Sequence, residues 1–170
     1  MTSSEIITTV ANLALTLSLI VAIVFGLAQI KSAKKDRRER LTLETLQNFQ
    51  SREFAEMLLF TATTQLPDSY EDWSAWPKDS RERFIHLMQQ MESLGILLAD
   101  GLIDIDLVDK TLGSFVSSTW EKFKPALLDM RVRMDDPFLA EYFQWMAEQI
   151  HRRMRENPRQ PFHETKKRLA

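Results

Sequence analysis

The sequence predicts an all-α protein in which an N-terminal transmembrane helix continues into a cytoplasmic antiparallel four-helix bundle. Three observations predict this fold class. A long uncharged apolar stretch opens the chain, amphipathic helical periodicity follows it, and strand alternation with hairpin turn signals is missing. We expect an anchor at residues 1–30, a basic juxtamembrane segment at 31–40, a helical bundle domain at 41–156 and a basic C-terminal tail at 157–170.

The composition excludes several classes of protein. The 170 residues include 22 Lys and Arg against 24 Asp and Glu, a formal net charge of −2. This balance argues against a dedicated nucleic-acid binder, so we expect no nucleic-acid partner. The hydrophobic fraction of 44% is enough to bury a core. The chain has no Cys, which excludes disulfides, thiolate metal sites and cysteine nucleophiles.

The stretch from Ile6 to Ile30 contains no charged residue. At ~1.5 Å per residue, a helix of this length exceeds the ~30 Å hydrocarbon thickness of a bilayer. A cleaved signal peptide would have a basic start, a shorter apolar run and a small-residue cleavage site, whereas the only charge before this run is Glu5. We therefore expect a retained single-pass anchor.

A cluster of basic residues follows the anchor. Lys and Arg beside a span stay on the cytoplasmic side, so we expect the N-terminus outside and the bundle inside. Each basic side chain near an anionic leaflet adds about 1 kcal/mol of attraction, which makes a bilayer with anionic headgroups the first expected partner. The residues expected at the membrane surface are Lys31, Lys34, Lys35, Arg37, Arg38 and Arg40.

One face of the anchor carries small residues. Ser18, Ala22 and Gly26 have the spacing that lets two helix backbones approach closely. Asn12 lies on the adjoining arc and needs a hydrogen-bond partner inside lipid. These four residues predict self-association into a homo-oligomer. The alternative is a monomeric anchor, because small residues are common in spans and threonines bond to their own backbone.

The first helix of the body can continue the anchor helix without a break. No Pro or Gly occurs between Gly26 and Pro67, so an unbroken helix can reach Thr61. Its apolar positions are Leu43, Leu46, Phe49, Phe54, Met57 and Leu58.

The next segment, residues 67–77, is expected to be an acidic loop. It contains Tyr70, Trp73 and Trp76. Loops on rigid scaffolds often carry recognition residues and tryptophan dominates interface hot spots, so these three are candidates for contact with a protein partner. The favoured alternative is that the rings fold back and plug one end of the bundle.

The second helix of the body is expected to begin after Pro77. Asp79 is its predicted N-cap and Glu82 the capping-box partner, and the helix is expected to stop at Asp100-Gly101. Its predicted inward face comprises Phe84, Leu87, Met88, Met91, Leu94, Gly95 and Leu98.

The third helix is expected to be capped by Asp104 or Asp106, and Pro125 is expected to kink or split it. Its inward residues are Val108, Leu112, Phe115, Val116, Thr119 and Phe123, with Trp120 at the core or its edge.

The last helix is expected to have Asp136 as N-cap and Pro137 at the first helical position, and to end before Asn157. Its inward residues are Leu139, Phe143, Met146 and Ile150, with Trp145 at the core or its edge.

An up-down-up-down bundle would place the basic tail beside the leaflet. The alternatives are that the tail pairs with acidic surface on its own or a neighbouring body, or that it is a solvated run without a role. The basic residues concerned are Arg152, Arg153, Arg155, Arg159, Lys166, Lys167 and Arg168.

The sequence contains no convincing catalytic or metal-binding motif. Glu148 and His151 form one Glu-x-x-His step, but a di-iron bundle site needs two, and His86 and His163 do not supply the second. No nucleophile elbow, phosphate-binding Gly-rich loop or zinc cluster occurs. We expect no cofactor and no metal. Helix capping accounts for the aspartates around Gly101, which lack EF-hand spacing: Asp100, Asp104, Asp106 and Asp109.

Three strings support a family resemblance: MESLGILLADGLIDIDLV, TWEKFKPAL and DDPFLAEYFQWMAEQI. Over Phe84 to Ile150 the chain resembles an uncharacterised bacterial family, a domain of unknown function with an N-terminal membrane helix before a compact helical domain. The resemblance implies bacterial origin, hence the inner (plasma) membrane, and no catalytic residue. Its signature positions here are Glu92, Leu94, Gly95, Gly101, Asp104, Trp120, Pro125, Pro137 and Phe143.

Three functional hypotheses follow. The first is a membrane-anchored cytoplasmic interaction or assembly module without catalytic activity. The second is an effector or sensor that perturbs the membrane, for example in defence against phage. The third is a metal-dependent helical-bundle enzyme that would use Glu148 and His151.

Overall fold

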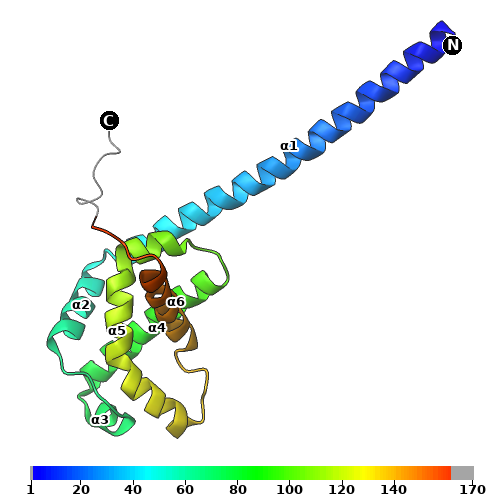
Figure 1. The fold of residues 1–170 in the computed structure, drawn as a ribbon. Coiled ribbons are helices and arrows are strands. Elements are labelled where there is room, and N and C mark those ends of the chain that lie inside the picture. The colour runs from blue at the N-terminus through cyan, green and yellow to red at the C-terminus, as the bar shows by residue number, and fades with distance from the viewer. Residues whose placement is uncertain (1, 162–170) are drawn as a thin grey trace. The chain divides into compact units, whose positions relative to one another are not determined.

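The computed structural model describes residues 2–161. All regular structure in that range is helical, as the sequence predicts, and the ribbon in Figure 1 shows the helices in chain order. The chain divides into two compact units, Met1–Arg40 and Leu41–Ala170. The first unit contains only the start of helix α1 (Ser3–Asn48), and the second contains the end of α1 and helices α2 to α6.

Helix α1 ends at Asn48, and α2 (Arg52–Thr63) is a separate helix. The expectation of one unbroken helix as far as Thr61 is therefore wrong. The break occurs because the Ser51 hydroxyl accepts a hydrogen bond from the backbone N of Phe54 at 3.2 Å and caps a new helix. The new helix direction places the Phe54 ring against Phe115, with centroids 5.1 Å apart.

The segment expected as a loop contains a short helix, α3 (Tyr70–Ala75), whose N-cap is Ser69. Helix α4 (Lys78–Ala99) follows, with Pro77 at the N-cap position and no side-chain cap. The predicted cap at Asp79 is wrong, because Asp79 lies inside the first turn. The predicted end is confirmed, since the chain leaves α4 through Gly101, whose φ of +67° suits glycine.

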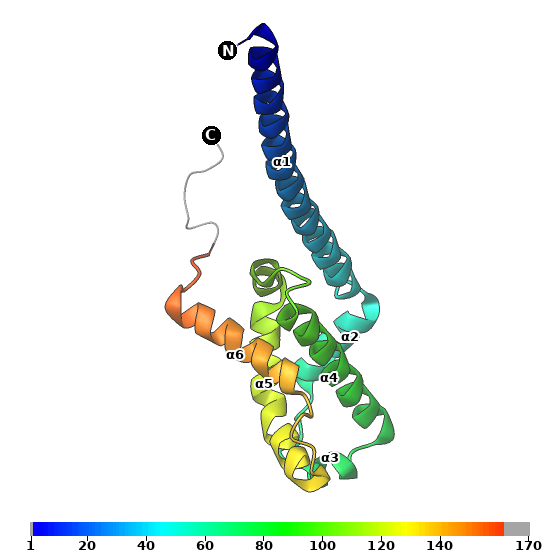
Figure 2. The same ribbon diagram turned by 90° about the vertical axis from the view of Figure 1, so that its right-hand side faces the viewer.

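Helix α5 (Ile105–Met134) is capped by Asp104, whose Oδ1 accepts from the backbone N of Asp106 at 2.9 Å and of Leu107 at 3.3 Å. Asp104 is thus the N-cap and Asp106 is not. Pro125 lies inside α5 and does not split it. Figure 2 shows a single helix that curves along its length.

Helix α6 (Glu141–Glu156) begins later than predicted. Asp136 does not cap it, because its Oδ1 accepts from the backbone N of Phe138 and closes a turn that includes Pro137. The residue at the N-cap position is Ala140, which has a left-handed backbone with φ of 58° and no capping side chain. The end of α6 before Asn157 agrees with the prediction.

The core of the second unit lies where α6 packs against α4 and α5, an arrangement visible in Figure 2. The predicted inward faces of α4, α5 and α6 are buried except at Met88, Phe115 and Leu139, which are partly buried. Trp120 is buried and Trp145 lies at the core edge, as predicted. The largest fully buried side chains include Phe84, Leu87, Met91, Leu94, Phe123, Leu127, Phe143, Met146 and Ile150.

Two residues of α4 fix the start of α6. The Glu92 carboxylate accepts from the backbone N of Tyr142 at 3.2 Å and of Phe143 at 2.8 Å, and so supplies the cap that Ala140 lacks. At Gly95 the helices approach so closely that a Cβ would lie 2.6 Å from the Tyr142 carbonyl carbon. Glycine at 95 is therefore required for the helix contact that brings Glu92 to its partners.

We predict that Gly95→Ala destabilises the protein. Helix propensity alone would favour alanine by about 1 kcal/mol, but the added methyl would overlap the Tyr142 carbonyl group, and overpacking of this kind costs about 1–3 kcal/mol. The measurement is chemical unfolding followed by circular dichroism. Ser93→Ala, at an exposed position of the same helix, is the matched control. Equal stability of the two variants would contradict the close contact.

Candidate functional site

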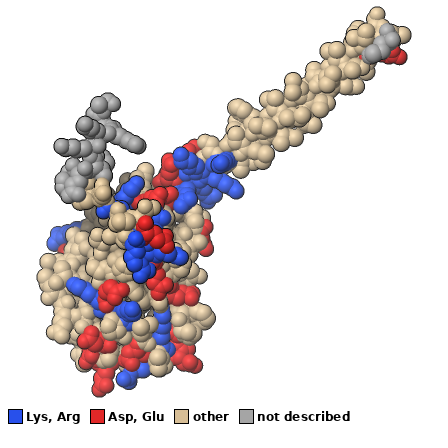
Figure 3. All heavy atoms as spheres, viewed as in Figure 1, with Lys and Arg blue, Asp and Glu red and all other residues tan. Residues whose placement is uncertain are grey.

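The first candidate site is the apolar part of α1. Among the described residues, α1 is the one helix long and apolar enough to cross a membrane, with a window of mean hydropathy 2.4. None of that window is buried within the chain. Figure 3 shows this stretch as a surface free of charged atoms up to the Lys and Arg cluster. A core helix of a water-soluble protein would be mostly buried, so a membrane anchor or a signal sequence fits this helix better.

The basic cluster lies in the same unit as the apolar stretch. Its side chains are exposed, and Lys35 forms an i, i+4 pair with Glu39 at 3.7 Å while remaining 76% exposed. An exposed pair of this kind is weak, so it leaves Lys35 able to contact other anions. The cluster comprises Lys31, Lys34, Lys35, Arg37, Arg38 and Arg40.

The polar side chains of the apolar stretch differ in whether they form hydrogen bonds within the chain. The hydroxyls of Thr8, Thr9 and Thr16 donate to backbone carbonyls one turn earlier, at 3.0, 2.8 and 2.8 Å. Within residues 2–161, the side-chain amide of Asn12 has no hydrogen-bond partner. Ser18 and Ala22 are exposed, and Gly26 has open space beside it.

The second candidate site is the tryptophan segment, where the three aromatic rings fold against the core of the second unit. Trp73 and Trp76 each lie with ring centroids 6.3 Å from Phe84, and Trp76 lies 6.0 Å from Phe60. Tyr70 lies 5.7 Å from Trp73. All three rings are half-buried, an arrangement that matches the plugging alternative.

Asp129 of α5 holds the start of α3. Its Oδ2 accepts from the backbone N of Tyr70 at 2.8 Å and from Nε of Arg133 at 3.0 Å. The Tyr70 hydrogen bond lowers the pKa of Asp129 below its ordinary value, partial burial opposes the shift, and Arg133 reinforces it.

We predict that the tryptophan segment loosens in acid. The folded-state pKa of Asp129 is lowered, so its contribution to stability is complete above the unfolded-state pKa of about 3.9 and is lost as the pH falls through the folded-state pKa. The measurement is tryptophan fluorescence between about pH 5 and pH 2. Asp129→Asn should remove this part of the pH dependence. An unchanged acid transition in that variant would show that another group controls it.

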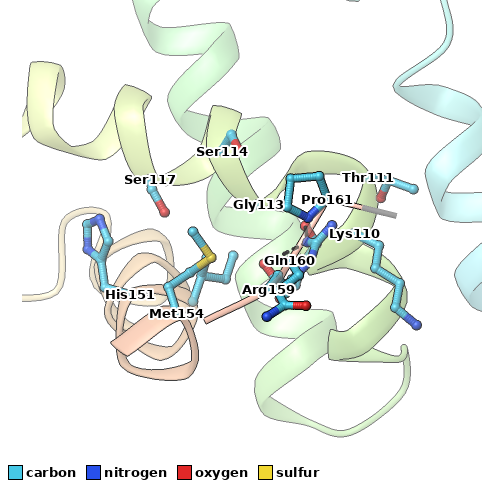
Figure 4. Close-up of a pocket in the computed structure, with 12 residues that line it drawn as sticks. Lys110, Thr111, Gly113, Ser114, Ser117, His151, Met154, Arg159, Gln160 and Pro161 are labelled. Atoms are coloured by element: carbon cyan, nitrogen blue, oxygen red, sulfur yellow. Dashed lines mark hydrogen bonds and ion pairs between the residues drawn. The ribbon is translucent and has the colours of Figure 1, made fainter. Parts of the chain in front are cut away.

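The third candidate site is a cavity of about 810 Å³ that residues of α5, α6 and the following segment line. Figure 4 shows Ser114 and Ser117 on α5 facing His151 and Met154 on α6, with Arg159 and Pro161 at the other side. Lys110, Thr111 and Gln160 also line it, and Ile150 and Gly113 are buried at its wall.

Asp109 lies at one edge of this cavity with its side chain only 7% exposed. Its backbone carbonyl accepts from Arg159 Nη1 at 2.8 Å, and the same nitrogen lies 3.5 Å from Asp109 Oδ1. Nearby, Arg153 pairs with Asp106. Capping therefore explains Asp104, whereas Asp106 and Asp109 bind arginines of the C-terminal part of the chain. These two pairs agree with the alternative that the basic tail pairs with acidic surface of its own body. The sequence did not identify the acidic partners, because the members of each pair lie far apart in the chain.

The remaining sequence candidates have ordinary surroundings. Glu148 is exposed, and its Oε1 accepts a hydrogen bond from Gln144 Nε2 at 2.8 Å. His86 Nε2 lies 3.5 Å from Gln90 Nε2. Within the described range, no three or more His, Asp or Glu residues gather as a metal site would require. Four residues of the tail lie outside the described residues, namely His163, Lys166, Lys167 and Arg168.

The comparisons with known proteins identify a family. The chain belongs to the family described as "Domain of unknown function (DUF4760)", whose profile matches residues 16–150. This confirms the expected uncharacterised family, and the match begins inside the apolar stretch and continues through most of α6. No curated protein and no solved structure matches the chain.

Proposed function

We propose that this DUF4760 protein is a single-pass protein of a bacterial inner membrane that holds a non-enzymatic helical interaction module in the cytoplasm. The observation that carries the proposal is the apolar stretch Ile6–Ile30, none of which is buried within the chain, together with the basic cluster that follows it. Exposed apolar side chains over this length are unfavourable in water, and a bilayer removes them from it. The charges that would bind anionic headgroups come directly after the stretch.

The orientation follows from the charge asymmetry. One acidic residue, Glu5, precedes the apolar stretch, and the Lys and Arg cluster follows it. The positive-inside rule then favours an external N-terminus and a cytoplasmic second unit. Helix α6 packs against both α4 and α5, which supports a bundle, and we propose that the helices of this unit form an antiparallel four-helix bundle.

The anchor also favours self-association. An Asn12 amide without a partner is costly in hydrocarbon, and a second copy of the helix can supply one. The surface of small residues at Ser18, Ala22 and Gly26 permits the close backbone approach that such a contact needs. We therefore propose a homo-oligomer that forms through the anchor.

We predict that a reporter fused after Ala170 is active only on the cytoplasmic side. A fluorescent protein fused there should fold in the cytoplasm and fluoresce. A phosphatase that is active only in the periplasm should be inactive at the same position. Replacing Lys31, Lys34 and Lys35 by Glu should shift part of the population to the opposite orientation, because basic residues set topology. A control replaces Lys110, Lys122 and Lys124 by Glu, far from the span in sequence. Phosphatase activity from the unaltered chain would contradict the proposed orientation.

We predict that the double variant Asn12→Leu with Gly26→Ile lowers the oligomeric state in detergent. The changes remove the amide that seeks a partner and the open space that allows close approach. The measurement is light scattering of the detergent-solubilised chain. Leu13→Ile with Val24→Leu is the matched control on the same helix. Unchanged assembly of the double variant would remove these residues from the contact.

A further inference from the structure

Asp109 differs from the other charged residues of the described chain. It is the only charged residue among residues 2–161 that is buried. Burial of a carboxylate is unfavourable unless a cation and hydrogen bonds compensate it. The observed cation, Arg159, is half-exposed and belongs to the segment after α6 that has no regular structure. A buried ion on a fixed helix is thus neutralised by a residue from outside any helix.

Gly113 makes room for this carboxylate. It lies one turn after Asp109 on α5, and a Cβ at 113 would overlap Asp109 Oδ1 and lie 3.4 Å from its Cγ. The carboxylate therefore occupies space that any other residue at 113 would fill. Together, Asp109 and Gly113 form a recess, which we call the Asp109 recess, at the edge of the 810 Å³ cavity.

The recess has the acceptors that a guanidinium needs. Arg159 meets two oxygens of one residue, the backbone carbonyl and the carboxylate of Asp109. Arg159 Nη1 makes both of these contacts. A guanidinium is more weakly hydrated than an ammonium, so it loses less hydration when it enters a buried site beside a carboxylate. Lys110 also lines the cavity and Arg153 lies nearby on Asp106. These cations disfavour a ligand with a second positive charge.

The cavity is larger than Arg159 requires. Its volume lies in the range of about 300–1,000 Å³ that is typical of small-molecule sites. Beyond the recess it offers the hydroxyls of Ser114 and Ser117, the ring of His151 and the thioether of Met154. A ligand of moderate size with one cationic end and a less polar body would contact both parts.

We propose that this cavity is a binding site for a guanidinium-bearing ligand. Asp109 recognises the cationic group, Gly113 makes room for the carboxylate, and Arg159 fills the recess when no ligand is bound. The segment at residues 157–161 then competes with the ligand, because both need the same two oxygens. Pro158 and Pro161 flank Arg159 and restrict the backbone, which lowers the entropy cost of keeping the arginine in place. The proposal is independent of the membrane anchor.

The test uses the full chain in detergent and two small probes, N-acetyl-argininamide and N-acetyl-lysinamide. Arg159→Gln empties the recess, and Arg155→Gln, an exposed arginine of α6, is the matched control for lost charge. Calorimetry gives the dissociation constants, and the NMR shift of the His151 ring reports binding in the cavity. Circular dichroism checks that each variant is folded.

We expect Arg159→Gln to bind N-acetyl-argininamide about 10-fold more tightly than the unaltered chain, the gain if Arg159 fills the recess in about nine molecules of ten. Arg155→Gln should bind like the unaltered chain, and N-acetyl-lysinamide should bind Arg159→Gln more weakly than the arginine probe. Adding Asp109→Asn to Arg159→Gln should abolish binding. If Arg159→Gln unfolds, N-acetyl-argininamide and not N-acetyl-lysinamide should restore its helicity.

The proposal is overturned if Arg159→Gln binds the arginine probe no better than Arg155→Gln, if it shows no binding or rescue, or if binding survives Asp109→Asn. A peptide of residues 156–161 distinguishes the source of the guanidinium. Tighter binding of the peptide than of N-acetyl-argininamide to Arg159→Gln supports an arginine from a protein segment. Equal binding supports a small guanidino compound.

Discussion

The contact between α4 and the first turn of α6 is the constraint on which the helical unit depends. Helix α6 starts after a left-handed Ala140 that has no capping side chain. Its free backbone N–H groups at Tyr142 and Phe143 are satisfied by Glu92 of α4. This reach is possible because Gly95 lets the two backbones come together. The buried residues Phe143, Met146 and Ile150 follow on α6, so their place in the core depends on where the helix begins.

The two units differ in whether their apolar side chains are buried within the chain. The helical unit buries its apolar side chains among its own helices, whereas the apolar stretch of the first unit leaves its side chains exposed. Exposure of so many apolar side chains to water is unfavourable. The proposal of a membrane anchor resolves this difference, and the basic cluster supports the orientation proposed for it. The ion pair between buried Asp109 and half-exposed Arg159 belongs to the helical unit alone and is a separate feature.

Local signals in the sequence predicted the helical class, the inward faces and several helix ends. Asp104 and Gly101 were recognised because a cap and a left-handed turn depend on nearby residues. The predicted start of α6 was wrong, because the residue that caps this helix is Glu92, some 50 positions earlier in the chain. The Asp109 recess was missed for the same reason, since only the fold brings Arg159 to it. The predicted unbroken helix was also wrong, because the Ser51 side chain caps a new helix after α1 although no Pro or Gly interrupts the sequence there.

The central claim is that the stretch from Ile6 to Ile30 lies within a bilayer. Alkaline carbonate extraction of cell membranes that contain the native chain tests it most directly. We expect the chain to stay in the membrane pellet and to be released only by detergent. The double variant Leu17→Arg with Val21→Arg should lose membrane insertion, because each arginine near the centre of a span costs about 2.5–3.5 kcal/mol on insertion scales. Release of the native chain into the alkaline supernatant would contradict the claim.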